Sequence, residues 1–132
     1  MNVVENIAFA LRVKGVSKME RSEQASGWLN KIGLQGYEKK KVDEISGGEG
    51  QRVQLARTLI AGFPILLLDE PFSALDVDLK NDLRVLLKKL VEETGVACLL
   101  VSHDPEDIER LADTYSEIQN GAIGKTVKTC HP

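Results

Sequence analysis

Two short, continuous apolar runs limit what this chain can fold into more than any other feature of its sequence. They cover residues 65–68 and 96–101. Runs of this length without polar alternation predict strands that are buried on both faces of a parallel sheet. Parallel strands need a crossover, and the segment between Asp76 and Gly95 carries leucines at helical spacing. The sequence therefore predicts a strand–helix–strand unit.

A glycine-rich segment, ISGGEGQR at residues 45–52, precedes the first apolar run and opens a helix. Ser46 can cap this helix, and Glu49, three residues later, can reach back in a capping box. Gly47 and Gly48 leave the first amides free of side-chain bulk, so the positive end of the helix is open to phosphate oxygens. Many helices begin with Ser-x-x-Glu and bind nothing, and the segment alone fits both interpretations.

The C-terminal part of the chain continues the alternation of helices and strands. Pro105 fits the first position of a helix that runs to about Ala112. Residues 114–119 are typical of a strand, Asn120-Gly121 of a hairpin turn and residues 122–127 of the return strand.

The order of the predicted elements defines the fold class. Residues 46–132 alternate helix and strand three times, which predicts an α/β domain with a parallel sheet. Residues 1–45 are predicted to be helical and to form a separate lobe. In this lobe apolar residues recur at helical spacing over residues 1–12, and Ser17 with Glu20 forms a second predicted capping box.

Composition and charge narrow the class of protein. The chain has 132 residues and a formal net charge of −3, and it lacks the basic stripe of a nucleic-acid surface, so no nucleic-acid partner is expected. No apolar run approaches the roughly 18 residues of a membrane-spanning helix. Cys98 lies in an apolar run and Cys130 in a polar tail with His131, which predicts neither a disulfide nor a metal site and favours a reducing, cytoplasmic setting.

Polar residues follow each predicted strand. Asp69 and Glu70 come directly after the first apolar run, and His103 follows the second. The carboxyl ends of parallel strands are where α/β sheets bind ligands. A solvated strand end with a surface histidine is the structural alternative. Asp76, ahead of the leucine-rich segment, is a predicted helix cap.

These segments together resemble the ATP-binding-cassette (ABC) ATPases over nearly the whole chain. ISGGEGQR is similar to the signature motif of that family, and ILLLDE at residues 65–70 to its Walker B strand. SALD at residues 73–76 resembles the D-loop, and Ser102-His103-Asp104 resembles the switch histidine. MNVVENIAFALR resembles the start of the helical subdomain after the Q-loop. The resemblance implies part of a P-loop NTPase (RecA-like) core, preceded by part of the helical subdomain.

The resemblance also implies roles for the residues after the strands. Asp69 would hold Mg²⁺, through water, because this ion keeps most of its hydration shell. Glu70 would orient the water that attacks the γ-phosphate of ATP, and His103 would contact that phosphate or the water.

The signature residues are implied to act between subunits. In the family, Ser46, Gly47 and Gly48 contact the nucleotide of a second ATPase subunit in a head-to-tail dimer. Asp76 would cross the dimer interface and couple the two ATP sites. Glu49 stands where the family commonly has glutamine, and we expect its carboxylate to fold back onto Ser46 rather than repel the triphosphate.

One element of the family is absent from the sequence. No segment reads G-x-x-x-x-G-K-[ST], the phosphate-binding Walker A loop, and GAIGKT at residues 121–126 has its first glycine two positions too close. The Q-loop glutamine and the aromatic residue that stacks on adenine are also missing. The chain is therefore expected to be a C-terminal portion that, alone, binds MgATP poorly, is inactive, and exposes unpaired apolar strands.

The implied function is that of the ATP-binding subunit of an importer. Such a subunit docks on a transmembrane permease, lies peripherally on the cytoplasmic face of the cell membrane, and couples ATP hydrolysis to solute transport. Two alternatives remain. The chain can be a non-catalytic module that supplies a signature helix to a full-length partner, or part of a soluble, non-transport ABC ATPase.

Overall fold

The computed structural model describes residues 1–130. The helices, in chain order, are α1 (Val3–Ile7), α2 (Phe9–Val13), α3 (Lys18–Lys31), the 3-10 turn η1 (Val42–Glu44), α4 (Gly47–Leu59), α5 (Val77–Thr94) and α6 (Pro105–Leu111). The strands are β1 (Ile65–Asp69), β2 (Ala97–Val101), β3 (Thr114–Tyr115), β4 (Ile118–Gln119), β5 (Ala122–Ile123) and β6 (Val127–Lys128). None of the helices in the described part of the chain is both long and apolar enough to cross a membrane.

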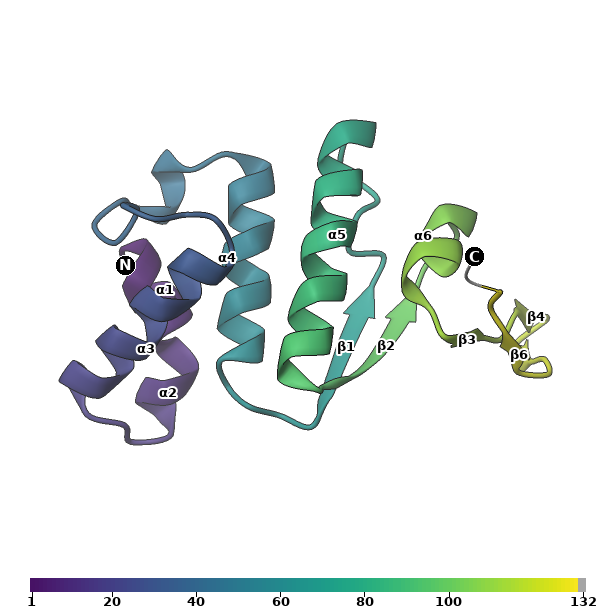
Figure 1. The fold of residues 1–132 in the computed structure, drawn as a ribbon, viewed down its shortest axis with the longest axis horizontal. Coiled ribbons are helices and arrows are strands. Elements are labelled where there is room, and N and C mark those ends of the chain that lie inside the picture. Colours follow the sequence, from purple (N-terminus) through teal and green to yellow (C-terminus); the bar gives the residue numbers. More distant parts are fainter. Residues whose placement is uncertain (131–132) are drawn as a thin grey trace.

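The predicted strand–helix–strand unit is confirmed and forms the centre of the molecule (Figure 1). Strands β1 and β2 are parallel, in a register that pairs Ile65 with Ala97 and Asp69 with Val101. Helix α5 makes the crossover between them, and Gly95, with φ +68°, ends this helix in the left-handed conformation that glycine adopts most easily. Because the two strands end level, the residues that follow them emerge at one edge.

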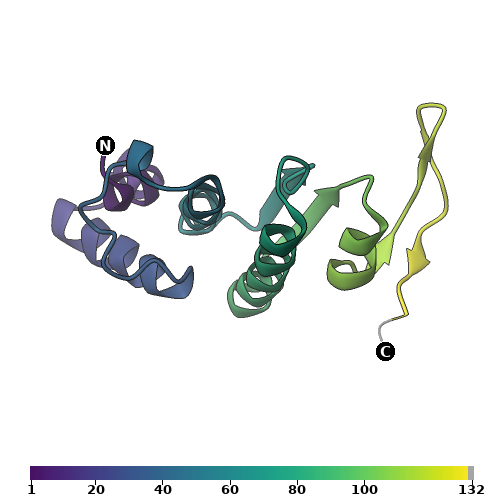
Figure 2. The same cartoon turned by 90° about the horizontal axis from the view of Figure 1, so that it is seen from above.

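The prediction that these strands are buried on both faces is wrong. Leu66 points into the core, but Leu67 is 68% exposed and Leu99 is 61% exposed. Figure 2 shows α5 along one face of the pair, and nothing in the described part of the chain covers the other face. An apolar run that lacks alternation shows that both faces of the strand are apolar, but it does not show what packs against each face.

The C-terminal strands do not extend the parallel sheet, contrary to the predicted alternation. Strand β3 pairs with β6 and β4 with β5, both antiparallel. The predicted hairpin turn is confirmed, with Asn120 at φ +50° and Gly121 at φ +76°. The predicted polar tail extends into residues 131–132, which lie outside the described part of the chain.

The N-terminal helices pack with α4 and α5 around one apolar core. Its fully buried side chains come from both predicted parts of the chain and include Ile7, Leu29, Val53 and Leu83. The single helix predicted over residues 1–12 is instead two short helices that meet at Ala8, which is the C-cap of α1 and the N-cap of α2. The division into residues 1–45 and 46–132 stays a prediction.

The second predicted capping box is only half formed. The Ser17 side chain accepts a hydrogen bond from the Glu20 amide, with 3.3 Å between nitrogen and oxygen. The Glu20 carboxylate does not complete the box, so this helix start has one capping bond rather than two.

Candidate active site

Glu70 and His103 meet at the edge where β1 and β2 end. The His103 ring nitrogen Nδ1 lies 2.6 Å from Glu70 Oε1, although the residues are 33 positions apart in the sequence. The Glu70 amide donates to the Val101 carbonyl at 2.8 Å, which extends the strand pairing by one residue. The structure therefore brings these two candidate side chains together at one edge of the sheet.

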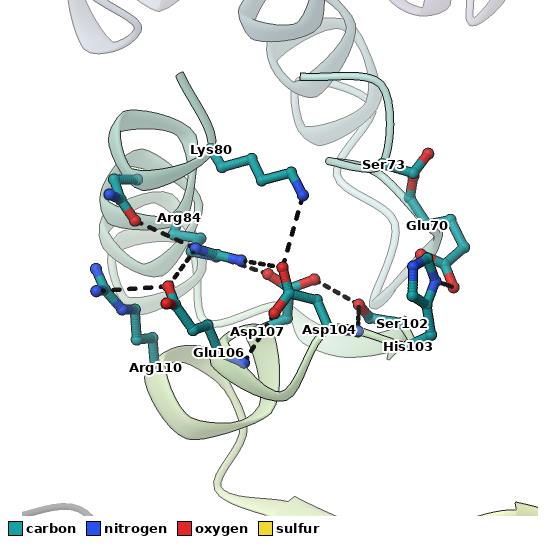
Figure 3. Close-up of polar contacts among 11 residues, drawn as sticks. Glu70, Ser73, Lys80, Arg84, Ser102, His103, Asp104, Glu106, Asp107 and Arg110 are labelled. Carbon is teal, nitrogen blue, oxygen red and sulfur yellow. Dashed lines mark hydrogen bonds and ion pairs between the residues drawn. The ribbon is translucent and has the colours of Figure 1, made fainter. Parts of the chain in front are cut away.

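The backbone of Glu70 adopts an unusual conformation. Its φ of +47° lies in the left-handed region, which costs a residue with a side chain about 1 kcal/mol or more. The Ser73 amide and hydroxyl both donate to the Glu70 carbonyl, at 3.3 Å and 3.1 Å, and hold this turn. The turn directs the carboxylate toward His103 instead of continuing the strand (Figure 3).

The contact with Glu70 changes the acid–base behaviour of His103. The hydrogen bond to the Glu70 carboxylate, and its negative charge, raise the pKa of His103 above the ordinary value of 6.5. The side chain is otherwise open to solvent, at 80% exposure. The imidazolium form is therefore favoured by a single carboxylate contact rather than by a buried pocket.

Asp69 and Glu70 line a cavity of about 350 Å³ between α4 and the end of β1. Gln51, Gln54 and Thr58 provide polar groups on the α4 side of this cavity. Within residues 1–130, the Asp69 carboxylate makes no hydrogen bond or ion pair, so its oxygens are free to bind a ligand. An unpartnered carboxylate beside an open cavity with both polar and apolar lining residues offers oxygen ligands to a hard cation such as Mg²⁺, which prefers oxygen and retains water.

The capping box at the start of α4 is confirmed. The Ser46 amide donates to Glu49 Oε2 at 2.7 Å, and the Glu49 amide donates to the Ser46 hydroxyl at 3.3 Å. Glu49 Oε1 also accepts a hydrogen bond of 2.7 Å from the Tyr37 hydroxyl. The hydrogen bonds from the Ser46 amide and from Tyr37 lower the pKa of Glu49 below its ordinary value of 4.5. The predicted fold-back of Glu49 is therefore the observed conformation.

The two signature glycines have different surroundings. A Cβ atom on Gly48 would lie 2.1 Å from Leu79 Cδ2, because the first turns of α4 and α5 touch there. A Cβ atom on Gly47 would meet nothing within 4 Å. The absence of a side chain at Gly48, which is buried, is thus required for the packing of α4 against α5, a requirement that the sequence pattern did not reveal.

The structure does not bring all the candidate residues into one cavity. Ser46, Gly47 and Gly48 do not line the cavity that contains Asp69 and Glu70. Asp76 caps α5, with its Oδ1 accepting from the Leu79 amide at 3.0 Å, as the structural interpretation predicted. The candidate residues therefore form two separate groups, one at the strand ends and one at the start of α4.

Sequence analysis missed a buried ionic cluster beside the strand ends. Arg84 of α5 and Asp107 of α6 are each 2% exposed and form an ion pair of 2.6 Å (Figure 3). The available signal was an arginine next to Leu83 on the leucine-rich face of α5, followed by an acidic helix start after His103. A charged residue on a buried face predicts an oppositely charged partner.

Comparison with known proteins identifies the family. A family model described as ABC transporter matches residues 1–73. The spermidine/putrescine import ATP-binding protein PotA of Mycoplasma capricolum is 40% identical over 123 residues, which are 93% of this chain and 35% of that protein. The taurine import ATP-binding protein TauB of Escherichia coli strain K12 is 44% identical over 120 residues, which are 91% of this chain and 47% of that protein.

A solved structure agrees with the fold. An ABC transporter in an inward-facing conformation superposes with a TM-score of 0.84 at 21% identity, covering 97% of this chain and 52% of its own. This likeness confirms the predicted α/β fold. The chain spans between about a third and a half of the length of the two curated relatives above. Because the family model matches more than half of its 132 residues, the chain belongs to the ABC transporter family.

Proposed function

We propose that this chain is part of the ATP-binding subunit of an ABC importer, which couples ATP hydrolysis to solute transport through a membrane permease. The observation that carries the proposal is the contact of 2.6 Å between Glu70 and His103 beside the free carboxylate of Asp69. The names of the relatives PotA and TauB, both import ATP-binding proteins, support the importer class.

The three residues at the strand ends would each have a separate role in ATP hydrolysis. Asp69 would hold Mg²⁺ through water, and the bound ion would neutralise charge on the phosphates. Glu70 would accept a hydrogen bond from the attacking water, since its second carboxylate oxygen is not used by His103. His103, favoured in its protonated form, would donate to the γ-phosphate from the opposite ring nitrogen.

The second group of residues would act on another subunit. The Ser46 amide is bound by Glu49, so phosphate oxygens would be received by the amides of Gly47 and Gly48 at the positive dipole end of α4 and by the Ser46 hydroxyl. Their separation from the cavity at Asp69 and Glu70 supports a head-to-tail dimer in which each ATP lies between two subunits. Asp76 would then lie between the two sites, at the start of α5.

The proposal includes a place in the cell and a partner. The subunit would lie on the cytoplasmic face of the membrane, bound to a transmembrane permease. The phosphate-binding loop must come from sequence outside these 132 residues, because no segment has its pattern. The 132-residue chain alone is therefore expected to bind MgATP poorly and to hydrolyse none of it.

A mixing experiment tests this function against the non-catalytic alternative. Mg²⁺-dependent ATP hydrolysis is measured for the complete subunit, for the 132-residue chain, and for a mixture with the chain in excess. We expect activity in the complete subunit, none in the chain, and no gain in the mixture. A gain that disappears with Ser46→Arg in the added chain would instead indicate a module that supplies its signature helix. An inactive complete subunit would contradict the hydrolytic function.

A further inference from the structure

Arg84 is the centre of the buried cluster between α5 and α6 (Figure 3). Its Nε donates to Asp107 Oδ1 at 2.6 Å, and its Nη2 donates to Asp104 Oδ2 at 2.8 Å. Its Nη1 donates to Glu106 Oε2 at 2.9 Å and to Asn81 Oδ1 at 3.2 Å. One guanidinium group on α5 therefore binds three carboxylates at the start of α6.

The same cluster holds both neighbours of His103. The Ser102 hydroxyl donates to Asp107 Oδ2 and accepts from the Asp104 amide at 3.0 Å. Asp104 is bound directly by Arg84, and Asp107 connects Arg84 to Ser102. The backbone before His103 and the backbone after it are thus tied to one buried side chain.

His103 has little else to fix its direction. Its side chain is 80% exposed, and its hydrogen-bond partner is Glu70. An exposed ring that is not packed against neighbours takes its position from the backbone that carries it. That backbone is the segment which the cluster holds.

We propose that Arg84 is the positioning residue for His103, because it fixes the segment Ser102–Asp104 so that the imidazole meets Glu70. The effect on ATP hydrolysis rests on the proposed function of Glu70 and His103, whereas the positioning itself does not. Arg84 touches neither Glu70 nor His103 and acts only through Ser102, Asp104 and Asp107.

The shape of the guanidinium group is essential to this role. Arginine offers several N–H donors in a rigid fork, whereas lysine offers one compact ammonium group on a flexible stem. Lys80, one turn earlier on α5, reaches Asp104 alone, at 3.6 Å. Arg84→Lys would keep the charge of the cluster but could not bind Asp104, Glu106 and Asp107 together.

Because Arg84→Lys keeps the charge of the cluster, it separates an effect of the position of His103 from an effect of charge. The charged groups that act on His103 are Glu70 and Asp104, which raise its pKa, and Lys80, which lowers it. Arg84→Lys removes none of these charges, so a change in the pKa of His103 reports a change in position. Loss of the contact with Glu70 would lower that pKa toward 6.5.

The experiment is a ¹³C NMR titration of histidine-labelled protein without nucleotide. The 132-residue chain contains only two histidines, and the substitution His131→Gln assigns the signal of His103. All samples also carry Ile65→Gln and Leu99→Gln, which make the exposed apolar face of the sheet more polar and are expected to reduce aggregation. We expect Arg84→Lys to lower the pKa of His103 measurably, toward its ordinary value of 6.5.

The matched control is Arg110→Lys, the same exchange at a residue that contacts Glu106 but neither Asp104 nor Asp107. It should leave the pKa of His103 unchanged. Ser102→Ala, which changes no charge, should lower the pKa of His103 as Arg84→Lys does. It serves as the test variant if Arg84→Lys does not fold. If Arg84→Lys folds, an unchanged pKa of His103 in this variant overturns the proposal. If Arg84→Lys does not fold, an unchanged pKa of His103 in Ser102→Ala overturns it. Because no ATP is present, this result is independent of whether the complete subunit hydrolyses ATP.

Discussion

At the residue scale, the carboxylate of Glu49 stabilises the fold without facing a ligand. It accepts from the Ser46 amide and from the Tyr37 hydroxyl, both at 2.7 Å. The ammonium group of Lys40 lies 3.6 Å from the centre of the Tyr37 ring and adds positive charge nearby. This environment explains how an acidic residue is accommodated at the positive end of α4 next to a proposed phosphate site.

Replacing Glu49 should therefore affect stability in a pH-dependent way. We expect Glu49→Ala to lower the free energy of unfolding by about 1 kcal/mol at pH 7, because two hydrogen bonds to a charged acceptor are lost. The folded-state pKa of Glu49 lies below 4.5, so its contribution is complete above that pH and is lost as the pH falls through the lower, folded value. Urea unfolding at pH 7 and at about pH 3 measures the difference. Glu38→Ala, at a carboxylate without these contacts, is the control; an equal loss at both pH values would contradict the prediction.

Glu49→Gln separates the cap from the charge. A glutamine side-chain oxygen can still accept from the Ser46 amide, so the fold-back conformation is retained. We expect ATP-driven dimerisation of the complete subunit to change only slightly. Analytical ultracentrifugation with and without MgATP measures this, and about tenfold tighter dimerisation would show that the charge does act on the nucleotide.

The two signature glycines should respond differently to alanine. Gly48→Ala places a methyl group against Leu79, whereas Gly47→Ala places it in open space. We expect the Gly48 variant to be less stable than the Gly47 variant by about 1–3 kcal/mol, because overpacking forces Leu79 to move. Thermal and urea unfolding of both variants give this difference. Equal stabilities would mean that the contact between α4 and α5 adjusts without cost.

At the element scale, α5 carries several functions at once. Its N-cap is Asp76, its buried face includes Leu83, Leu87 and Leu90, and its Arg84 binds the start of α6. The element connects the start of α4, through Leu79, to the segment that carries His103. A single crossover helix thus positions residues from both groups of the candidate site.

Substitutions at Asp76 distinguish capping from an interface role. Asp76→Ala should lower the free energy of unfolding by about 1 kcal/mol, and Asp76→Asn should restore most of it because asparagine also caps helices. If Asp76 also couples two ATP sites, Asp76→Asn should be stable but reduce ATP hydrolysis by the complete dimer. Unfolding curves and ATPase rates of the two variants separate the effects. Full activity in a stable Asp76→Asn subunit would restrict this residue to capping.

The elements also show what the sequence could predict. Capping and periodicity are local, so they correctly indicated α4, α5 and the turn at Asn120-Gly121. Strand pairing and the burial of a sheet face depend on residues that are far apart in the sequence. The strand expected over residues 114–119 has no parallel neighbour and divides into β3 and β4, and the Arg84 cluster joins Arg84 to Asp104, 20 residues later in the sequence. The sequence carries a signal for the charged partners of Arg84, but a local window does not show which helix provides them.

At the scale of the whole molecule, the apolar face of the sheet opposite α5 is the main risk for aggregation. Ile65, Leu67, Leu99 and Val101 together expose apolar surface from two adjacent strands. An exposed apolar sheet face of this kind promotes association between molecules. The chain spans 35% of the PotA protein and 47% of the TauB protein that it resembles.

Self-association should therefore depend on this face. We expect the 132-residue chain to form oligomers or aggregates at micromolar concentration, and the double substitution Ile65→Gln with Leu99→Gln to shift it toward monomer. Size-exclusion chromatography with light scattering measures the change. Lys88→Gln with Lys89→Gln, on the exposed surface of α5, is a control of equal number that should have little effect. A monomeric chain with a sharp two-state melt would contradict the expectation.

In the proposed function, Glu70 directs hydrolysis of ATP from the end of β1. ATP turnover by the complete subunit, compared between the wild type, Glu70→Gln and the control Glu109→Gln, tests it most directly. We expect Glu70→Gln to lower kcat by about 100-fold or more while MgATP still binds, because the amide keeps the size of the side chain but loses the carboxylate base. The Glu109 control should retain full turnover. Wild-type turnover in the Glu70→Gln subunit would show that Glu70 does not direct the hydrolysis.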